Sequence, residues 1–263
     1  MGVGRCGPGS GPRRGHWRRR CGVRLVGSAL AATLAACSSG STPANDLSSK
    51  PPSTIVHLSF AAALARGSVR QTLTYSGPGV SEVDVFNSAK EEGEQTGQGT
   101  FGTGTFLVVS GVLYESGDAT FLASSGFPSP INTRLAGRWI SLQPSDSGFA
   151  AGADGVTLDS ALTDSAPTGT LTTTGPTRVD GRSVVAVSGG LGVNAPTGTS
   201  GSQVLYVSDV SPYLPVMVLQ RTTENGHRLT ITARFSNWGE NVSVVAPSNA
   251  IPASSIGTST FGT

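Results

Sequence analysis

The chain lacks cysteine beyond position 37 and has no long apolar run, and each absence excludes a class of structure. All three cysteines, Cys6, Cys21 and Cys37, lie within the first 37 residues. The rest of the chain therefore has no disulfide framework and no thiolate metal site. Polar residues interrupt every apolar stretch beyond Thr54, whereas a membrane-spanning helix needs about 20 apolar residues. We expect the part after Cys37 to fold around an ordinary core outside the bilayer.

The first 36 residues have the three parts of a secretory signal. Seven arginines between Arg5 and Arg24 precede a short apolar run, Leu25 to Ala36, which ends in small residues. The next residue is Cys37, and the sequence Leu34-Ala35-Ala36-Cys37 resembles the lipobox of bacterial lipoproteins. The pattern predicts a signal peptide over residues 1–36 and lipidation at Cys37.

Removal of the signal reverses the charge of the protein. Seven of the 18 Lys and Arg residues lie before Cys37, which leaves 11 against 16 Asp and Glu and gives a net charge of −5. A net negative charge is repelled by the phosphate backbone of nucleic acids, so no nucleic-acid partner is expected.

A lipid on Cys37 would fix the location of the protein. Each buried CH₂ contributes about 0.8 kcal/mol, and two acyl chains such as palmitate hold a protein stably where one is marginal. A diacylglyceryl cysteine meets that requirement. We expect the protein on the outer face of the bacterial cytoplasmic membrane, in the cell envelope.

Composition divides the exported chain into three parts. Residues 37–53 are rich in Ser and Pro and read as the lipidated cysteine followed by a disordered tether. Residues 54–247 are long enough for one domain with a substantial core. Residues 248–263 are rich in Ser and Thr and read as a flexible tail.

The pattern within residues 54–247 predicts an α+β fold. Apolar residues recur at helical spacing from Ile55 to Ala65, and Gly67 ends that helix. Short helices over 129–136 and 149–162 flank a short strand at 139–142. Asp180-Gly181 and Asn225-Gly226 are typical hairpin turns. The remaining β-type segments, expected to form an antiparallel sheet covered on one face by helices, are 69–75, 81–86, 103–109, 112–115, 119–123, 168–174, 183–187, 203–207, 216–220, 228–235 and 242–245.

No constellation of catalytic residues is evident. The sequence Gly97 to Gly102 matches GxGxxG, but it leads into the expected strand from Thr103 and opens no helix. Glu91, Glu92 and Glu94 read as a solvated Gly-rich loop. His57 and His227 stand apart from any ligand-spaced cluster. We therefore expect no enzyme, no metal site and no cofactor.

Several short motifs, in order, resemble actinobacterial envelope lipoproteins of the LppX and LprG type. They are Gly117-Asp-Ala-Thr-Phe-Leu122, Gly137-Arg-Trp139, Thr168-Gly-Thr-Leu171, Tyr213-Leu-Pro-Val216 and Phe235-Ser-Asn-Trp-Gly-Glu-Asn-Val242. The resemblance covers most of residues 54–247. It implies a fold similar to LolA and LolB, in which a strongly curved antiparallel half-barrel sheet wraps over helices.

The same resemblance implies a function in lipid handling. A lipid or glycolipid would occupy an apolar cavity between sheet and helices, and directed transport would need an envelope transporter as partner, since no energy source is visible. From apolar periodicity, with Val83 and Val85 on one face, we select as lining residues Leu73, Tyr75, Val85, Phe106, Val108 and Phe121. The alternative is a non-catalytic structural or protein-interaction lipoprotein with a filled core, because periodicity places the same residues inside in both cases.

The lipobox generates the first prediction. Cys37→Ala removes the only thiol at the cleavage site, so both processing and acylation there should be lost. Metabolic labelling with a fatty-acid analogue checks this, with Cys21→Ala as the control that should label normally. Equal labelling of Cys37→Ala and the unmodified protein would contradict the assignment.

Overall fold

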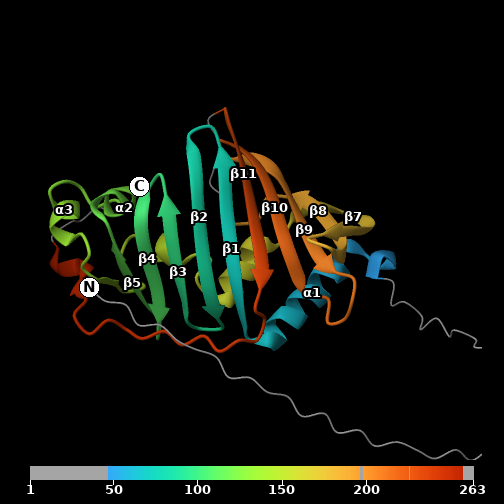
Figure 1. The fold of residues 1–263 in the computed structure, drawn as a ribbon, viewed down its shortest axis with the longest axis horizontal. Coiled ribbons are helices and arrows are strands. Elements are labelled where there is room, and N and C mark those ends of the chain that lie inside the picture. Colours follow the sequence, from blue (N-terminus) through green and yellow to red (C-terminus); the bar gives the residue numbers. More distant parts are fainter. Residues whose placement is uncertain (1–46, 196–197, 225, 257–263) are drawn as a thin grey trace, which may run out of the picture. The chain divides into compact units, whose positions relative to one another are not determined.

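The computed structural model describes residues 47–195, 198–224 and 226–256. The described residues all belong to one compact unit. Its main feature is an open twelve-stranded sheet with the strand order β12-β6-β5-β4-β3-β2-β1-β11-β10-β9-β8-β7 (Figure 1). All neighbouring strands are antiparallel except β12 and β6. This confirms the predicted α+β class with an open antiparallel sheet.

The strands follow the chain in two long series that meet in the middle of the sheet. β1 pairs with β2 on one side and with β11 on the other, so it joins the two series. The strand bounds are β1 Ser68–Gly77, β2 Val80–Ala89, β3 Gly93–Gly99, β4 Gly102–Val109, β5 Val112–Gly117, β6 Ile140–Leu142, β7 Thr168–Val179, β8 Arg182–Gly190, β9 Ser200–Ser208, β10 Pro215–Glu224, β11 His227–Ser236 and β12 Ile251–Pro252.

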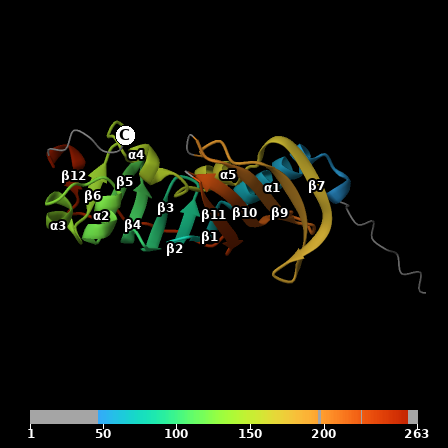
Figure 2. The ribbon, with the colours of Figure 1, turned by 90° about the horizontal axis from the view of Figure 1, so that it is seen from above.

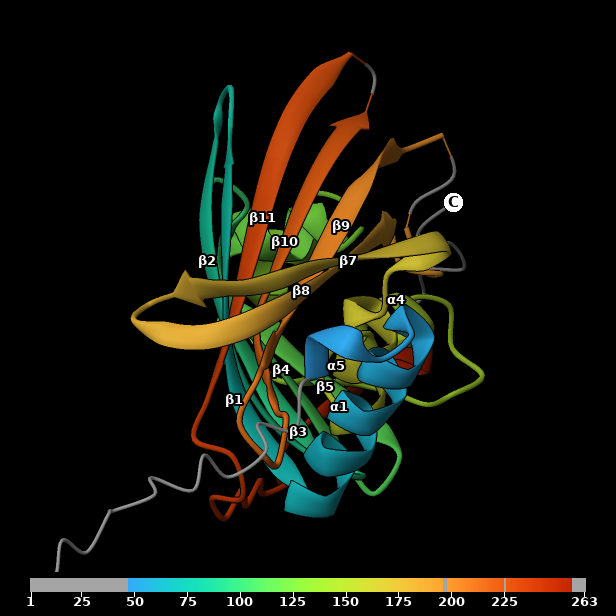
Figure 3. The same cartoon turned by 90° about the vertical axis from the view of Figure 1, so that its right-hand side faces the viewer.

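The central helices lie on one face of the sheet. Helices α1, α4 and α5 all lie on the same side in two perpendicular views, and β7 and β8 cross steeply over the neighbouring strands (Figures 2 and 3). The helix bounds are η1 Leu47–Ser49, α1 Pro52–Arg66, α2 Ala119–Ser124, α3 Ile131–Leu135, α4 Phe149–Ala153, α5 Leu158–Ser165 and η2 Ala253–Ser255. The face that they cover is called the inner face from here on.

One helix end and one hairpin turn have the backbone conformations that the sequence predicts. Gly67 adopts a left-handed conformation at the C-terminus of α1, with φ of 78°, and ends the helix there. Asp180 and Gly181 both have positive φ, as a type I′ hairpin between β7 and β8 requires. Both predictions are confirmed.

The predicted strand at 119–123 is instead the helix α2. The Asp118 side chain accepts a hydrogen bond from the Phe121 backbone N–H at 2.8 Å and caps the helix. A second bond, from the Thr103 N–H at 2.8 Å, ties that cap to β4. This local capping outweighs the β propensity of a Thr-Phe-Leu segment.

The predicted glutamate loop around Glu94 is mostly strand β3. β3 pairs with β2 and β4 over its whole length, although three of its four inner-face positions are glycine. The glycines meet a spatial requirement. A Cβ on Gly97 would lie 2.6 Å from Asp84 Oδ1, and one on Gly104, in the adjacent strand, would overlap the Phe121 ring. Polar and glycine-rich composition here reflects close packing rather than a loop.

The inner face carries two separate hydrophobic cores. The first core joins α1 and α5 to β8, β9, β10 and β11, and includes Ile55, Leu162 and Phe235. The second core joins β4, β5 and β6 to α2 and α3, and includes Leu113 and Phe127. Leu73 on β1 packs against both. The centre of the sheet is thus the junction between them.

Both ends of the domain extend further than the sequence predicts. Leu47, placed in the tether, is 1% exposed and belongs to the first core. At the other end, Ile251 and Pro252, placed in the flexible tail, pair with β6 as β12, and Ala253 is buried in the second core. Apolar contacts with distant strands order both segments, and single-sequence composition does not report such contacts. The signal segment and Cys37 lie outside the described residues.

The position of Leu47 generates a stability prediction. Leu47→Ala should lower the free energy of unfolding by about 2–5 kcal/mol, as for a fully buried leucine. The matched control is Leu64→Ala on α1, where the leucine is 46% exposed and the loss should stay below about 1 kcal/mol. Urea unfolding of residues 38–263 measures both. Equal losses would show that residue 47 is not a core position.

Candidate functional site

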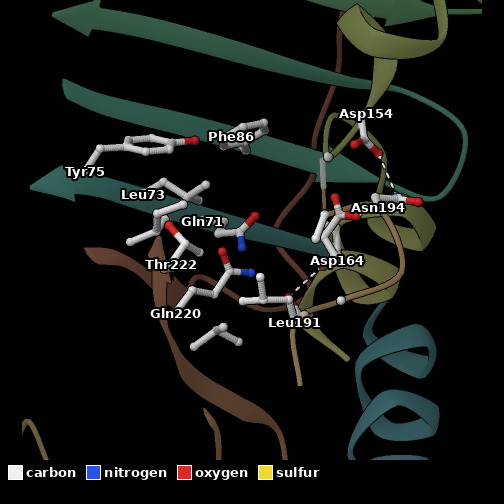
Figure 4. Close-up of a pocket in the computed structure, with 18 of the residues that line it drawn as sticks. Gln71, Leu73, Tyr75, Phe86, Asp154, Asp164, Leu191, Asn194, Gln220 and Thr222 are labelled. Atoms are coloured by element: carbon white, nitrogen blue, oxygen red, sulfur yellow. Dashed lines mark hydrogen bonds between the residues drawn. The ribbon is translucent and has the colours of Figure 1, made fainter. Parts of the chain in front are cut away.

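A cavity of about 440 Å³ lies at the junction of the two cores. Its floor is the inner face of β1, β10 and β11 with contributions from β2, β3 and β4, and it is covered by α4, α5, residues 191–195 and Thr199 (Figure 4). The lining residues are Gln71, Leu73, Tyr75, Phe86, Gln95, Phe106, Ala151, Asp154, Gly155, Ala161, Asp164, Ser165, Leu191, Gly192, Asn194, Ala195, Thr199, Val218, Gln220, Thr222, Leu229, Ile231 and Ala233. The wall is therefore mixed, with aliphatic and aromatic carbon interrupted by amides and carboxyl groups.

The structure brings together three of the six residues selected from the sequence. Leu73, Tyr75 and Phe106 all line the cavity. Leu73 and Tyr75 alternate along β1 and therefore share its inner face. Whether these residues contact a ligand stays a prediction.

The other three selected residues lie elsewhere. Val85 is on the opposite face of β2 from Phe86, the residue that lines the cavity. Val108 is buried in the second core. Phe121 projects from α2 onto β4 and packs against Phe106, with ring centroids 5.3 Å apart.

Glutamines form a polar band across the cavity wall. Gln71, Gln95 and Gln220 line the cavity, and Gln203 lies fully buried behind it. They share the inner face with apolar neighbours two residues away, such as Leu73 and Val218. Burial of an amide is unfavourable unless it is hydrogen-bonded, so each needs a partner inside the protein or on a ligand.

Gln203 connects the sheet to the segments that cover the cavity. Its amide Nε2 donates to the Asp164 carbonyl at 3.0 Å, at the end of α5. Its Oε1 accepts from the Gly192 N–H at 3.1 Å and from Gln220 Nε2 at 2.8 Å. One buried side chain thereby holds α5 and the 191–195 segment against β9 and β10.

An amide joins two carboxyl groups at the cavity rim. Asn194 Nδ2 donates to Asp164 Oδ1 at 2.7 Å and to Asp154 Oδ1 at 3.2 Å. Burial, together with the nearby charge of Asp154, raises the pKa of Asp164 to about 6, and the Asn194 bond partly offsets this. Burial also raises the pKa of Asp154, and bonds from the Gly155 backbone and Asn194 partly offset that shift.

A second acidic cluster lies at the Tyr75 end of the site. Burial and the neighbouring Asp84 raise the pKa of the Tyr75 hydroxyl. Burial also raises the pKa of Asp84, an effect partly offset by hydrogen bonding to Tyr75 and Gln95. Burial and Asp84 raise the pKa of Glu82. The side chains of this cluster all lie on the inner face of β1, β2 and β3. They are Tyr75, Glu82, Asp84 and Gln95.

A further buried carboxyl group, that of Glu115, lies in the part of the sheet that supports the second core. Glu115 on β5 is 3% exposed, pairs across the ladder with Phe106, and its Oε1 has no hydrogen-bond partner among the described residues. Burial raises its pKa to about 7, and a hydrogen bond with Ser125 partly counters that shift. Glu115 lies outside the cavity lining.

Sequence reasoning missed the polar residues of the site, although a signal for them exists. In β9 the apolar positions Leu205 and Val207 alternate in phase with Gln203, and in β2 Phe86 is in phase with Asp84. A polar residue in the core-facing phase of a strand is therefore the signal that could have found Gln203 and Asp84, although Glu115 gives the same signal outside the cavity. Among the described residues, no helix is long and apolar enough to cross a membrane.

No family model and no curated protein matches the chain. Solved structures similar to it include the Mycobacterium tuberculosis lipoprotein LppX, with 14% identity and a TM-score of 0.46 over 74% of this chain and 98% of that one. LprF from Mycobacterium bovis has 16% identity and a TM-score of 0.45 over 74% and 96%. An outer membrane lipoprotein-sorting protein domain from Vibrio parahaemolyticus has 8% identity and a TM-score of 0.30 over 71% and 92%. One of these similar structures, LppX, bears the name of the lipoprotein type that the sequence motifs resemble.

Glu115 generates a prediction for pH-dependent stability. Its pKa of about 7 in the folded chain exceeds the ordinary 4.5, so the folded state binds more protons between these values. The free energy of unfolding contributed by this group therefore falls as pH rises from 4.5 to 7. Glu115→Gln removes the cost of the buried charge and should stabilise the protein by about 1–3 kcal/mol at pH 8, with little effect at pH 4.

Urea unfolding at both pH values measures this difference. Glu91→Gln, at an exposed position, is the control and should change stability by less than about 0.5 kcal/mol. A Glu115→Gln protein less stable than the parent at pH 8 would show that the carboxylate has a favourable partner.

Proposed function

We propose that this protein is an envelope lipoprotein that binds one amphiphilic molecule in the cavity between its two cores and carries it at the membrane surface. The cavity supports the proposal most directly. Protein interiors are packed so closely that few voids exceed a water molecule. A space of about 440 Å³ lies within the range of roughly 300–1,000 Å³ that is typical of ligand pockets. It favours a binding protein over the alternative with a filled core.

The lining favours a ligand that is partly apolar. Leu73, Phe86 and Ile231 offer hydrocarbon contact, whereas Gln71 and Gln220 offer amide groups on the same wall. A purely hydrocarbon ligand would leave these amides desolvated and without partners, which is costly. An acyl chain joined to a polar head group matches both parts of the wall.

Lipidation at Cys37 would keep this site close to the membrane. The core begins at Leu47, and ten residues reach at most about 35 Å even when fully extended. An anchored domain on so short a connection could exchange ligand with the outer face of the cytoplasmic membrane. Release into another layer of the envelope would use a partner protein, and an envelope transporter is the partner that we propose.

A filled-cavity variant tests the function. Thr222 lines the cavity, so Thr222→Trp should occupy it while keeping the fold. Co-purified lipid should then be lost. The matched control is Thr223→Trp, since the next residue of β10 lies on the other face of the sheet, and that protein should retain lipid.

Mass spectrometry of solvent extracts from residues 38–263, purified from a bacterial envelope, gives the lipid content. Thermal unfolding of the same samples should show less than about 1 kcal/mol of destabilisation for Thr222→Trp, because overpacking a filled core would cost about 1–3 kcal/mol. A parent protein that holds no lipid, together with a destabilised Thr222→Trp protein, would favour the structural alternative.

A further inference from the structure

The charged groups of the cavity wall all have one sign. Among the described lining residues the charged side chains are Asp154 and Asp164, and none is Lys, Arg or His. Among the described residues the ion pair joins Arg234 to Asp180, which are both exposed and outside the cavity. No described cation therefore neutralises the carboxylates at the rim.

The rim has more hydrogen-bond acceptors than donors. Asn194 provides the amide that bonds to both Asp154 and Asp164. Two carboxylates offer about eight lone-pair positions, whereas one amide NH₂ has two protons. In Figure 4 these three residues gather at one end of the cavity, opposite Tyr75. A head group placed beside them would meet unused carboxylate oxygens.

Buried oxygen atoms at and next to the cavity also lack hydrogen-bond partners in the described part of the chain. Asp84 is 4% exposed, on the inner face between Leu73 and Gly97. Its Oδ2 accepts from Gln95 at 3.3 Å, and its Oδ1 has no partner within hydrogen-bond geometry among the described residues, although the Tyr75 hydroxyl is near enough to influence the group. Asp84 itself lies outside the cavity lining, next to Gln95, which lines it. Thr199 lines the cavity, and its buried Oγ1, a hydroxyl that can donate or accept, is likewise without a described partner. A buried polar atom without a partner is costly, and a carboxylate oxygen can be satisfied only by a donor, so the site gains from a ligand that donates.

We propose that the ligand of this cavity is an amphiphile whose head group carries hydrogen-bond donors and no negative charge, either an ammonium group or a hydroxyl-rich sugar. This inference rests on the proposed function and specifies its ligand class. Asp154 and Asp164 at the rim accept hydrogen bonds from that head group. The acyl part packs along Leu73, Phe86 and Ile231.

The same geometry disfavours phosphate and sulfate head groups. An anion at the rim would face two carboxylates in a partly desolvated site, where like charges at close range repel each other. It would also bring further acceptors to a wall that already lacks donors. Positions for anions in proteins are supplied by Arg, Lys or clustered backbone N–H groups, and the described lining has no basic side chain.

Three probes with the same ten-carbon chain test the proposal. Decylamine, decyl glucoside and decyl sulfate are titrated below their micelle concentrations into lipid-stripped residues 38–263 at pH 7.5, and calorimetry gives each dissociation constant. At least one of decylamine and decyl glucoside should bind about tenfold or more tightly than decyl sulfate, which corresponds to about 1.4 kcal/mol. The tighter of the two identifies the head group as cationic or hydroxyl-rich.

Variants assign the discrimination to the rim. In the double variant Asp154→Asn, Asp164→Asn the preference over decyl sulfate should shrink at least about threefold. The matched control is Asp159→Asn, which removes one negative charge from the exposed side of the same helix, α5, and should leave the preference unchanged. Thr222→Trp should abolish binding of every probe.

The outcomes distinguish failure of the head-group assignment from failure of the proposed lipid-binding function. Decyl sulfate binding as tightly as the other probes, with Thr222→Trp abolishing all binding, would overturn the head-group assignment and leave the proposed function standing. An unchanged preference in the double variant would also overturn the assignment. Failure of all three probes to bind the parent protein would overturn both.

Discussion

One continuous sheet supports two separate hydrophobic cores, and the cavity exists because neither core crosses the junction between them. β1 joins the two series of strands, and its residue Leu73 packs against both cores. Next to it the inner face carries Gln71, Asp84 and the glycines of β3 instead of large apolar side chains. Helices cover such a face without filling it with apolar side chains, because the polar groups on it need hydrogen-bond partners.

A few buried hydrogen bonds then determine how the cavity is covered. Gln203 binds the end of α5, the Gly192 backbone and Gln220 at once. Asn194 ties the same covering segment to Asp154 and Asp164. These contacts position acidic groups at the rim without filling the space behind them. The folding requirement and the proposed ligand chemistry thus depend on the same side chains.

The sequence could not determine which residues of each strand point toward the core. Val83 and Val85 suggest by hydrophobicity alone that their side of β2 faces the core, yet the buried phase contains Asp84, Phe86 and Ser88. Polar residues lie inside at this site, as the proposed binding of an amphiphile would require, so the usual alternation reverses locally. Phe121 was misplaced for a related reason, since the cap supplied by Asp118 turns a β-type segment into a helix that packs on β4.

The sequence by itself predicts an export signal with Cys37, and it determined the α+β class, the Gly67 helix end and the Asp180-Gly181 hairpin, because short-range chemistry and local backbone preference decide these features. It also placed Leu73, Tyr75 and Phe106 on inward strand positions. Only the tertiary structure decided that Leu47 and Ile251 belong to the cores, that β3 is a strand, and that Gln203, Asp154 and Asp164 meet at one cavity. Those features come from residues far apart in the chain, whose contacts depend on strand register and packing rather than on local sequence.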